Sequence, residues 1–249
     1  MQRDILLKTI KDYENEFKKF IGAGEFPTYE LQTYEVSLAV ADTRGYDAAA
    51  CTFYEPQNRK HVLRVSTNLI LSEYLIFHEF THMLDSETYA KDDKVRYAGL
   101  SGFTEYHASQ IELVKLLGAD TIDKVPTFSM DTIVDTFAGE KSVSQYVGMK
   151  QQHAIDLFNR VDFPKDIDTL KSAVGVLYNY FGLRSICEMY STDYTEVINN
   201  RAFLKFIPTQ EFVMLNRLMH GWLDKDKVDL SIEIYLNMIF PLIKQFRLA

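Results

Sequence analysis

Cysteine is scarce in this sequence. Its 249 residues include only two, Cys51 and Cys187. Each lies in an apolar stretch, where a free thiol packs as a small buried side chain. Two cysteines so far apart do not form the closely spaced, even-numbered set of a disulfide-stapled domain. We therefore expect no disulfide framework.

Long apolar segments and basic clusters are missing too. No run approaches the roughly 18 apolar residues that a membrane helix needs, and the first twenty residues lack the apolar core and cleavage site of a signal peptide. The formal net charge is −8 at pH 7, and lysine and arginine form no stripe of the kind that binds DNA or RNA. These absences predict a cytoplasmic protein with neither a membrane nor a nucleic acid as a partner.

Apolar residues, by contrast, are plentiful. They make up 47% of the chain, and 13% of the residues are aromatic, which is enough for a sizeable core and argues against disorder. Residues 3 to about 20 repeat apolar positions with a helical period. Partly alternating stretches follow at Tyr34–Val40, Cys51–Tyr54 and His61–Ser66, and predict two or three strands of a small antiparallel sheet.

From Ser72 onward the pattern is helical almost to the end, with breaks expected at glycine and proline, for example at Gly182 and Pro241. The order of helix, sheet and long helical run indicates an α+β fold. We expect residues 1–120 to form a catalytic core of an N-terminal helix, a small sheet and two further helices. Residues 121–249 would form a helical region that packs on this core or continues it as one domain.

One short motif points to metal chemistry. The segment after Phe77 reads His78-Glu79-Phe80-Thr81-His82, an HExxH sequence. Residues four apart lie on one face of a helix, so both imidazoles can bind one ion. Neutral imidazole is a suitable zinc ligand. Glu79 follows the first ligand on the same side, where it can act as the general base toward a water activated by the metal.

The rest of this helix agrees with such a site. An apolar stripe runs along the opposite side and would be buried against the core, formed by Ile76, Phe77, Phe80, Met83 and Leu84. Ser72 and Glu73 suit the start of a helix, since a carboxylate in the first turn is favourable. The competing interpretation is a surface helix with two incidental histidines and a solvated glutamate.

A catalytic zinc site uses three protein ligands and one open position. A third histidine at the short spacing HExxHxxGxxH is excluded, because Asp85 and Thr88 stand where its glycine and histidine would fall. The next candidate is Glu105, near the start of a second helix that would run to Gly118, a good C-terminal cap. The small Ala108 would let this helix approach the first closely. In the alternative interpretation, Glu105 is an ordinary acid in a first helical turn.

The segments HEFTHMLD and SGFTEYHAS together resemble the gluzincin pattern of thermolysin-like peptidases, in which HExxH is followed by a helix with a glutamate ligand. The lead-in RVSTNLILSEYLIFHEFTH, with Glu105 and Ala108 downstream, is also similar to ImmA/IrrE-like metallopeptidases of phages and mobile elements. The resemblance covers roughly residues 48 to 118. It implies a zincin-like core in which His78, His82 and Glu105 bind Zn²⁺ and Glu79 is the general base.

The chain departs from the thermolysin-like pattern at one position. Those enzymes have an aspartate four residues after the ligand glutamate, which orients a ligand histidine, and Ser109 stands there in this chain. Ligand histidines usually need such a partner. Asp85 or Glu112 can take over that role.

These observations together predict a zinc metallopeptidase that acts on a protein or peptide. One alternative is a binding or structural protein of a phage or mobile element that keeps a zincin shell without turnover. Another is a zinc hydrolase for a non-peptide amide. Amide hydrolysis also requires a donor for the developing oxyanion. Tyr97, between the two metal-binding helices, is our first choice, and the other candidates are Tyr106, His107, His153 and His220.

Overall fold

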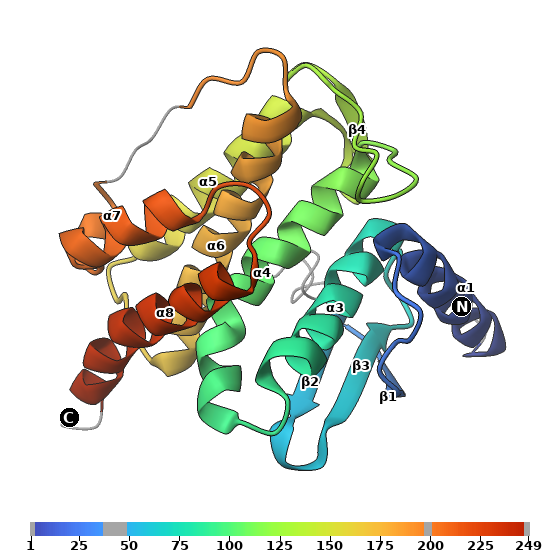
Figure 1. The fold of residues 1–249 in the computed structure, drawn as a ribbon, viewed down its shortest axis with the longest axis horizontal. Coiled ribbons are helices and arrows are strands. Elements are labelled where there is room, and N and C mark those ends of the chain that lie inside the picture. Colours follow the sequence, from blue (N-terminus) through green and yellow to red (C-terminus); the bar gives the residue numbers. More distant parts are fainter. Residues whose placement is uncertain (1–2, 37–48, 197–200, 247–249) are drawn as a thin grey trace. The chain divides into compact units, whose positions relative to one another are not determined.

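The computed structural model describes residues 3–36, 49–196 and 201–246, and Figure 1 shows its elements in chain order. The described residues form two compact units. The first unit is drawn from Met1–Tyr97, Ile111–Pro126 and Asp135–Glu140, and the second from Ala98–Gln110, Thr127–Val134 and Lys141–Ala249. The division into residues 1–120 and 121–249 stays a prediction from the sequence.

The first unit contains helices α1 and α3 and a three-stranded sheet. Helix α1 is Arg3–Ile21, the strands are β1 (Tyr29–Tyr34), β2 (Ala50–Glu55) and β3 (Lys60–Ser66), and α3 is Glu73–Asp85. The short helical turns η2 (Pro56–Asn58) and η3 (Ser86–Ala90) follow β2 and α3. The sequence prediction is confirmed for α1, for strands β2 and β3, and for the start of α3 directly after Ser72.

The sheet is mixed rather than antiparallel, so that detail of the prediction is wrong. Strand β3 lies in the middle, in the order β1-β3-β2, and pairs antiparallel with β2 but parallel with β1. The connection between β2 and β3 at Pro56–Asn58 is short, and a short connection can join only antiparallel strands. Parallel strands need a longer crossover, and residues 35–59 between β1 and β3 are numerous enough to form one. Residues 37–40 of the strand expected at Tyr34–Val40 lie outside the described residues.

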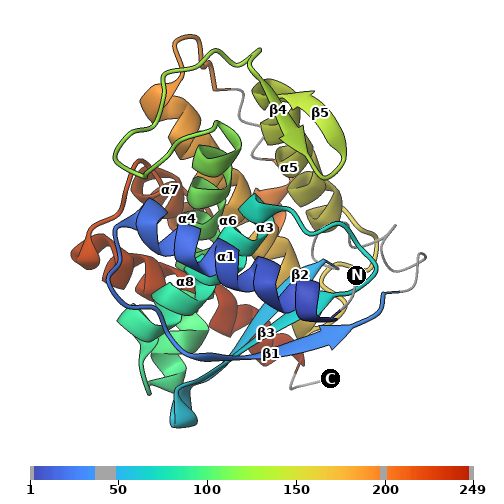
Figure 2. The same cartoon turned by 90° about the vertical axis from the view of Figure 1, so that its right-hand side faces the viewer.

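Aromatic side chains join α1 to α3. Leu6, Ile10, Phe17 and Phe20 of α1 are buried, as the helical period predicted. The Phe17 ring meets the rings of Phe77 and Phe80 at centroid distances of 5.2 and 5.5 Å. Figure 2 shows both helices on the same side of the three strands. The packed aromatic face of α3 leaves its other side for polar residues.

Helix α4 (Lys94–Leu116) begins and ends on standard capping signals. The Asp93 carboxylate accepts hydrogen bonds from the backbone N–H groups of Val95 and Arg96 at 2.8 and 2.9 Å. Gly118 beyond the last turn has a φ of +78°, which confirms its predicted role as a C-terminal cap. Because the helix starts at Lys94, Glu105 lies in its middle and not near its start.

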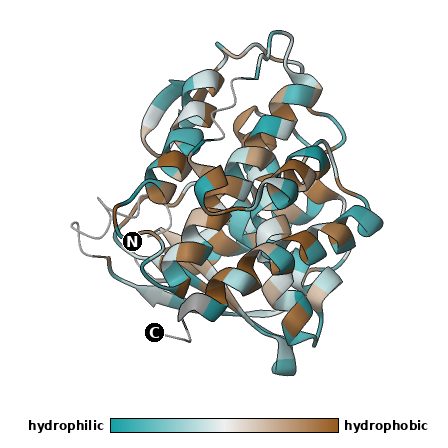
Figure 3. Cartoon of the chain, turned by 90° about the vertical axis from the view of Figure 1, so that its left-hand side faces the viewer, coloured by the Kyte–Doolittle hydropathy of each residue, from teal (hydrophilic) through white to brown (hydrophobic). Residues whose placement is uncertain are grey.

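The second unit is mainly helical. Its helices are α5 (Val143–Phe158), α6 (Ile167–Tyr190), α7 (Thr209–Leu218) and α8 (Lys225–Phe246), with the short turn η4 at Phe203–Lys205. Hydrophobic and hydrophilic residues are interspersed along the ribbon in Figure 3. The hairpin of β4 (Ile133–Thr136) and β5 (Gly139–Ser142), whose residues are divided between the two units, was not predicted, because its strands are only four residues long. The α+β class is confirmed.

Two of the expected helix breaks are wrong. Gly182 lies inside α6, and Pro241 lies inside α8. At Gly182 the reason is packing: a Cβ atom there would lie 2.2 Å from the Tyr106 carbonyl oxygen of α4. The glycine thus permits a close helix crossing and does not end its helix. None of the described helices is long and apolar enough to cross a membrane.

Candidate metal centre

His78, Glu79 and His82 converge on the polar side of α3. Their potential ligand atoms, an imidazole nitrogen from each histidine and a carboxylate oxygen, all lie within 4.8 Å of one another. The two imidazole rings have centroids 4.7 Å apart and planes at 80°. One turn of helix brings the rings together, as the four-residue spacing predicted.

The His78 ring is held by a buried carboxylate. Its Nδ1 atom lies 2.8 Å from Glu112 Oε2 on α4, and the side chains of His78 and Glu112 are 7% and 0% exposed. With Glu112 as an ionised carboxylate, which only accepts hydrogen bonds, the proton of the pair lies on Nδ1 and Nε2 keeps its lone pair for a metal. This is the arrangement that orients a metal-ligating histidine and raises its basicity. Of the two acids predicted to orient a ligand histidine, Asp85 and Glu112, it is Glu112 that makes this contact with His78.

Glu79 has a partner on the sheet. The Thr52 hydroxyl of β2 donates to Glu79 Oε2 at 2.9 Å, and both residues are half-buried. Thr52 was not among the residues predicted for the site, although its place on a strand offered a signal. Side chains alternate along a strand, and its neighbours on the same face, Ala50 and Tyr54, are both buried. Thr52 therefore belongs to the inward face of β2.

The opposite side of α3 is apolar, as predicted. Ile76, Phe77, Phe80 and Met83 are at most 1% exposed, whereas Leu84, also predicted for this stripe, is only half-buried. The Lys115 ammonium of α4 lies 4.9 Å from the centre of the Phe77 ring and 3.1 Å from Glu73 in the first turn of α3. Burial raises the pKa of Glu73 to about 6, a shift to which its hydrogen bond with Glu16 adds. This packing fixes the rotation of α3, and with it the direction of His78 and His82.

Glu105 and Ser109 lie in the part of α4 that belongs to the second unit. A Cβ atom added at Gly175 of α6 would lie 3.7 Å from the Glu105 carboxylate, so the two residues lie close together. The Ser109 hydroxyl is buried and donates to Asn179 Oδ1 at 2.7 Å. The proposed roles of both residues toward the metal stay predictions.

Asp85 and Tyr97 belong to the first unit. Asp85 ends α3 and is 1% exposed. Tyr97 lies in the first turn of α4 with its ring 5.3 Å from that of Tyr54, and burial raises its pKa. A phenol with a raised pKa keeps its proton at neutral pH and can donate a hydrogen bond. Two predictions therefore stay predictions: that Asp85 orients a ligand histidine, and that Tyr97 donates a hydrogen bond to the oxyanion.

Tyr106, His107 and His220, three of the other oxyanion candidates, have partners within the second unit. The Tyr106 hydroxyl donates to the Gly221 carbonyl at 2.6 Å. His107 stacks on Phe103 and meets Trp222 edge-on. His220 Nδ1 lies 2.7 Å from Glu188 Oε2. His153 is partly buried, which lowers its pKa. These contacts are consistent with packing roles for Tyr106 and His107.

The donor set of the centre fits a divalent metal ion. Two imidazole nitrogens and a carboxylate oxygen are ligands that zinc and its neighbours in the first transition row accept. A buried carboxylate behind one imidazole is the expected support. The group of His78, Glu79 and His82 could therefore hold a metal ion.

Fold and site together define an α+β protein with an HExxH helix whose polar residues converge. Comparison of the chain with protein-family models, curated proteins and solved structures gave no match. The chemistry of the centre therefore follows from its own side chains.

Proposed function

We propose that this protein is a zinc-dependent peptidase with Glu79 as the general base. The observation that supports it most strongly is the convergence of His78, Glu79 and His82 within 4.8 Å. Structural zinc sites use four protein ligands, whereas catalytic ones use three and add an acid–base group. The HExxH helix offers two ligands and that additional carboxylate.

In this proposal His78, His82 and Glu105 hold the ion. Glu105 precedes Glu112 by seven residues on the same helix, and seven residues are close to two full turns. The two carboxylates therefore start from the same face of α4, the face from which Glu112 contacts His78. Ser109 and Asp85 would complete the polar surroundings of the ligands. The proposed Glu105 ligation rests on helical periodicity and on the resemblance to gluzincins.

Zinc, when bound, supplies a Lewis acid that polarises a carbonyl group and makes water more acidic. The protein's own residues move the protons. Glu79 accepts a proton from the attacking water and later delivers it to the leaving amine. Tyr97, whose raised pKa keeps it protonated, is the proposed donor to the oxyanion.

The sheet supports a peptide as the substrate. Within the described part of the chain, β2 is an edge strand whose only partner is β3. An edge strand presents unpaired backbone N–H and C=O groups, with which an extended peptide can pair. Thr52 of β2 contacts Glu79, so this edge runs beside the proposed base. Backbone pairing would favour a peptide over a small non-peptide amide.

The experiment compares wild-type protein with Glu79→Gln. Zinc per chain is measured after purification without added metal, and cleavage is measured on a diverse peptide library. We expect similar zinc contents and a loss of cleavage by about 10²- to 10⁴-fold in Glu79→Gln, the usual contribution of a general base. Glu55→Gln, an exposed glutamate of β2, is the matched control and should cleave like wild type.

Two results would contradict the proposal. Wild-type protein that binds zinc but cleaves no peptide would favour the alternative of a binding or structural protein with a zincin shell. Cleavage that survives in Glu79→Gln would assign the proton transfer to another residue.

A further inference from the structure

We propose that Thr52 is a positioning residue, which orients the Glu79 carboxylate so that Oε1 carries out the proton transfer. This inference rests on the proposed peptidase function and adds a residue to its machinery. It starts from the hydrogen bond between Thr52 Oγ1 and Glu79 Oε2, 2.9 Å long, which links the sheet to the HExxH helix.

The backbone around Thr52 is firmly held. Thr52 pairs with Leu63 in the antiparallel ladder of β2 and β3, and Leu63 is fully buried. A threonine side chain is also stiff, since its branched Cβ restricts the first torsion. The hydroxyl thus comes from a fixed point, whereas the Glu79 side chain has three rotatable bonds. Thr52 therefore determines the orientation of Glu79 more than Glu79 determines that of Thr52.

The chemistry of the two groups fixes the direction of the bond. An ionised carboxylate has only acceptor sites, so the threonine hydroxyl must be the donor. A donor on Oε2 restricts the rotation of the carboxylate and so limits the positions that Oε1 can take. Holding a base in its reactive geometry lowers the barrier, because the orientation does not have to be found at the moment of reaction. Thr52 thereby favours a single orientation of the base.

A second threonine close to the site shows that this contact is not a generic one. Thr81 lies between Glu79 and His82, but its hydroxyl donates to the Phe77 carbonyl one turn back at 2.8 Å. That bond is local to α3 and is the usual fate of a threonine within a helix. The Thr52 bond instead joins residues 27 positions apart, on different elements. Among these two threonines, only Thr52 reaches the base.

The test uses a pair of substitutions at one position. Thr52→Val keeps the shape of the side chain and removes the hydroxyl, whereas Thr52→Ser keeps the hydroxyl. With a peptide that wild type cleaves, we expect kcat to fall roughly tenfold in Thr52→Val, a part of the total contribution of a general base. KM and zinc content should stay within twofold of wild type, and Thr52→Ser should recover most of kcat. Thr33→Val, on the opposite edge strand β1, is the control and should leave kcat unchanged.

A second measurement does not depend on activity. The midpoints of urea unfolding are compared in metal-free wild type, Thr52→Val, Glu79→Ala and the double variant. If the two side chains interact, the shift of the double variant will be smaller than the sum of the two single shifts. The cycle with Thr33→Val in place of Thr52→Val should be additive.

The outcomes separate this inference from the proposed function. An active wild type, an inactive Glu79→Gln and a Thr52→Val with wild-type kcat would overturn the role of Thr52 and leave the peptidase standing. Additive unfolding shifts for Thr52→Val and Glu79→Ala would overturn the contact itself. A zinc-bound wild type that cleaves nothing would overturn both proposals.

Discussion

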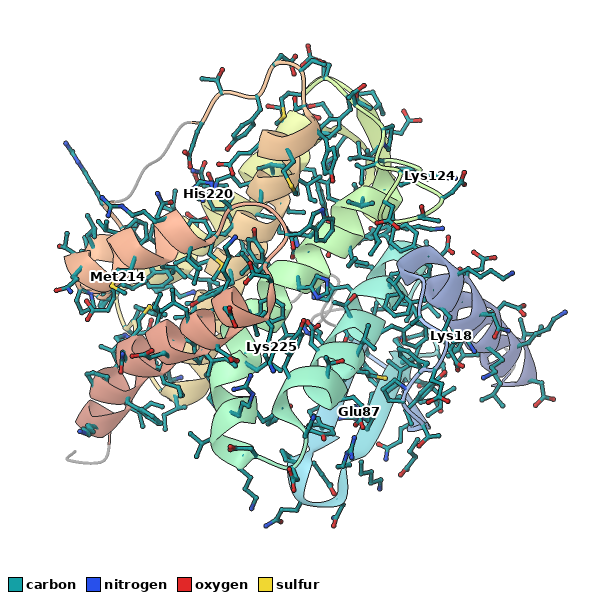
Figure 4. The ribbon with its side chains drawn as sticks, in the orientation of Figure 1. Lys18, Glu87, Lys124, Met214, His220 and Lys225 are labelled. Carbon is teal, nitrogen blue, oxygen red and sulfur yellow. The ribbon has the colours of Figure 1, made fainter. Side chains whose placement is uncertain are left out.

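Each of the two units contains a histidine paired with a glutamate, and the two pairs differ mainly in burial. In the first unit, His78 Nδ1 lies 2.8 Å from Glu112, with side chains 7% and 0% exposed. In the second unit, His220 Nδ1 lies 2.7 Å from Glu188, with side chains 45% and 22% exposed. Figure 4 labels His220.

The surroundings explain what each pair can do. Glu188 also meets the buried Arg184 guanidinium at 3.3 Å, and Arg184 donates to the Met219 carbonyl next to His220. That pair ties a loop to α6 at the protein surface, where such a contact contributes little free energy. Glu112 is fully buried, and removal of one partner of a buried pair is costly. Its imidazole partner also belongs to the convergent group on α3. The same pairing is thus a surface contact in one unit and, in the other, a support for a group that could hold a metal ion.

Removal of each imidazole should give the largest difference between the two pairs. We expect His78→Ala to weaken zinc binding by more than about 100-fold, because loss of an orienting partner alone already costs 10- to 100-fold. His220→Ala should bind zinc like wild type. Competition with a chromophoric chelator gives both affinities. Equal affinities for the two variants would mean that zinc is not bound at the HExxH helix.

Neutralising the carboxylates should give a smaller difference. Glu112→Gln keeps the size of the side chain but replaces the carboxylate that orients His78, so zinc affinity should fall by about 10- to 100-fold. Glu188→Gln should leave it within twofold. The same chelator competition measures both variants, and thermal unfolding checks that both are folded. If Glu112→Gln bound zinc as tightly as wild type, the His78–Glu112 bond would be a packing contact only.

A third histidine, His61, extends the comparison to pH. It stacks on Tyr54 at 4.4 Å and is 2% exposed. Its Nε2 lies 3.3 Å from Glu87, labelled in Figure 4, and that carboxylate also pairs with Arg59. Burial, with the Arg59 charge, lowers the pKa of His61 to about 4.

The sign of the pH effect follows from this lowered pKa. An unfolded histidine takes up its proton near pH 6.5, before the folded one does, so the free energy of unfolding falls as the pH drops toward 4. Between pH 7 and pH 5 we expect the titration of His61 to lower the free energy of unfolding by about 1 to 2 kcal/mol. His61→Phe should remove it, which flattens the dependence measured by urea unfolding. Leu63→Ala is the control, because leucine is buried nearby and has no titratable group. It should lower the free energy of unfolding equally at pH 7 and pH 5.

Local patterns in the sequence predicted the parts of the molecule that depend on near neighbours. The spacing of His78 and His82 predicted their convergence, since it needs only one helical turn. Gly118 and the strands beginning at Ala50 and Lys60 followed from turn and alternation signals. The class of the fold followed from the order of these elements.

Contacts between distant residues were harder to predict. The Thr52–Glu79 and His78–Glu112 bonds join residues 27 and 34 positions apart. Glu112 was one of two acids, with Asp85, that the sequence offered as a partner for a ligand histidine, whereas for Thr52 the only signal was its place on a strand. The parallel pairing of β1 with β3 was not predicted for the same reason, because the residues of a strand do not determine which other strand it pairs with.

The close crossing at Gly182 has a consequence for tracing the ancestry of this chain. An alanine methyl group there would lie 2.2 Å from the Tyr106 carbonyl oxygen, so homologues that retain the crossing should retain glycine. Such a residue is useful in a search for homologues whose overall sequence identity is low. A pattern of HExxH, a glutamate 34 positions after its first histidine and a glycine inside a later helix would select candidate relatives by physical constraint.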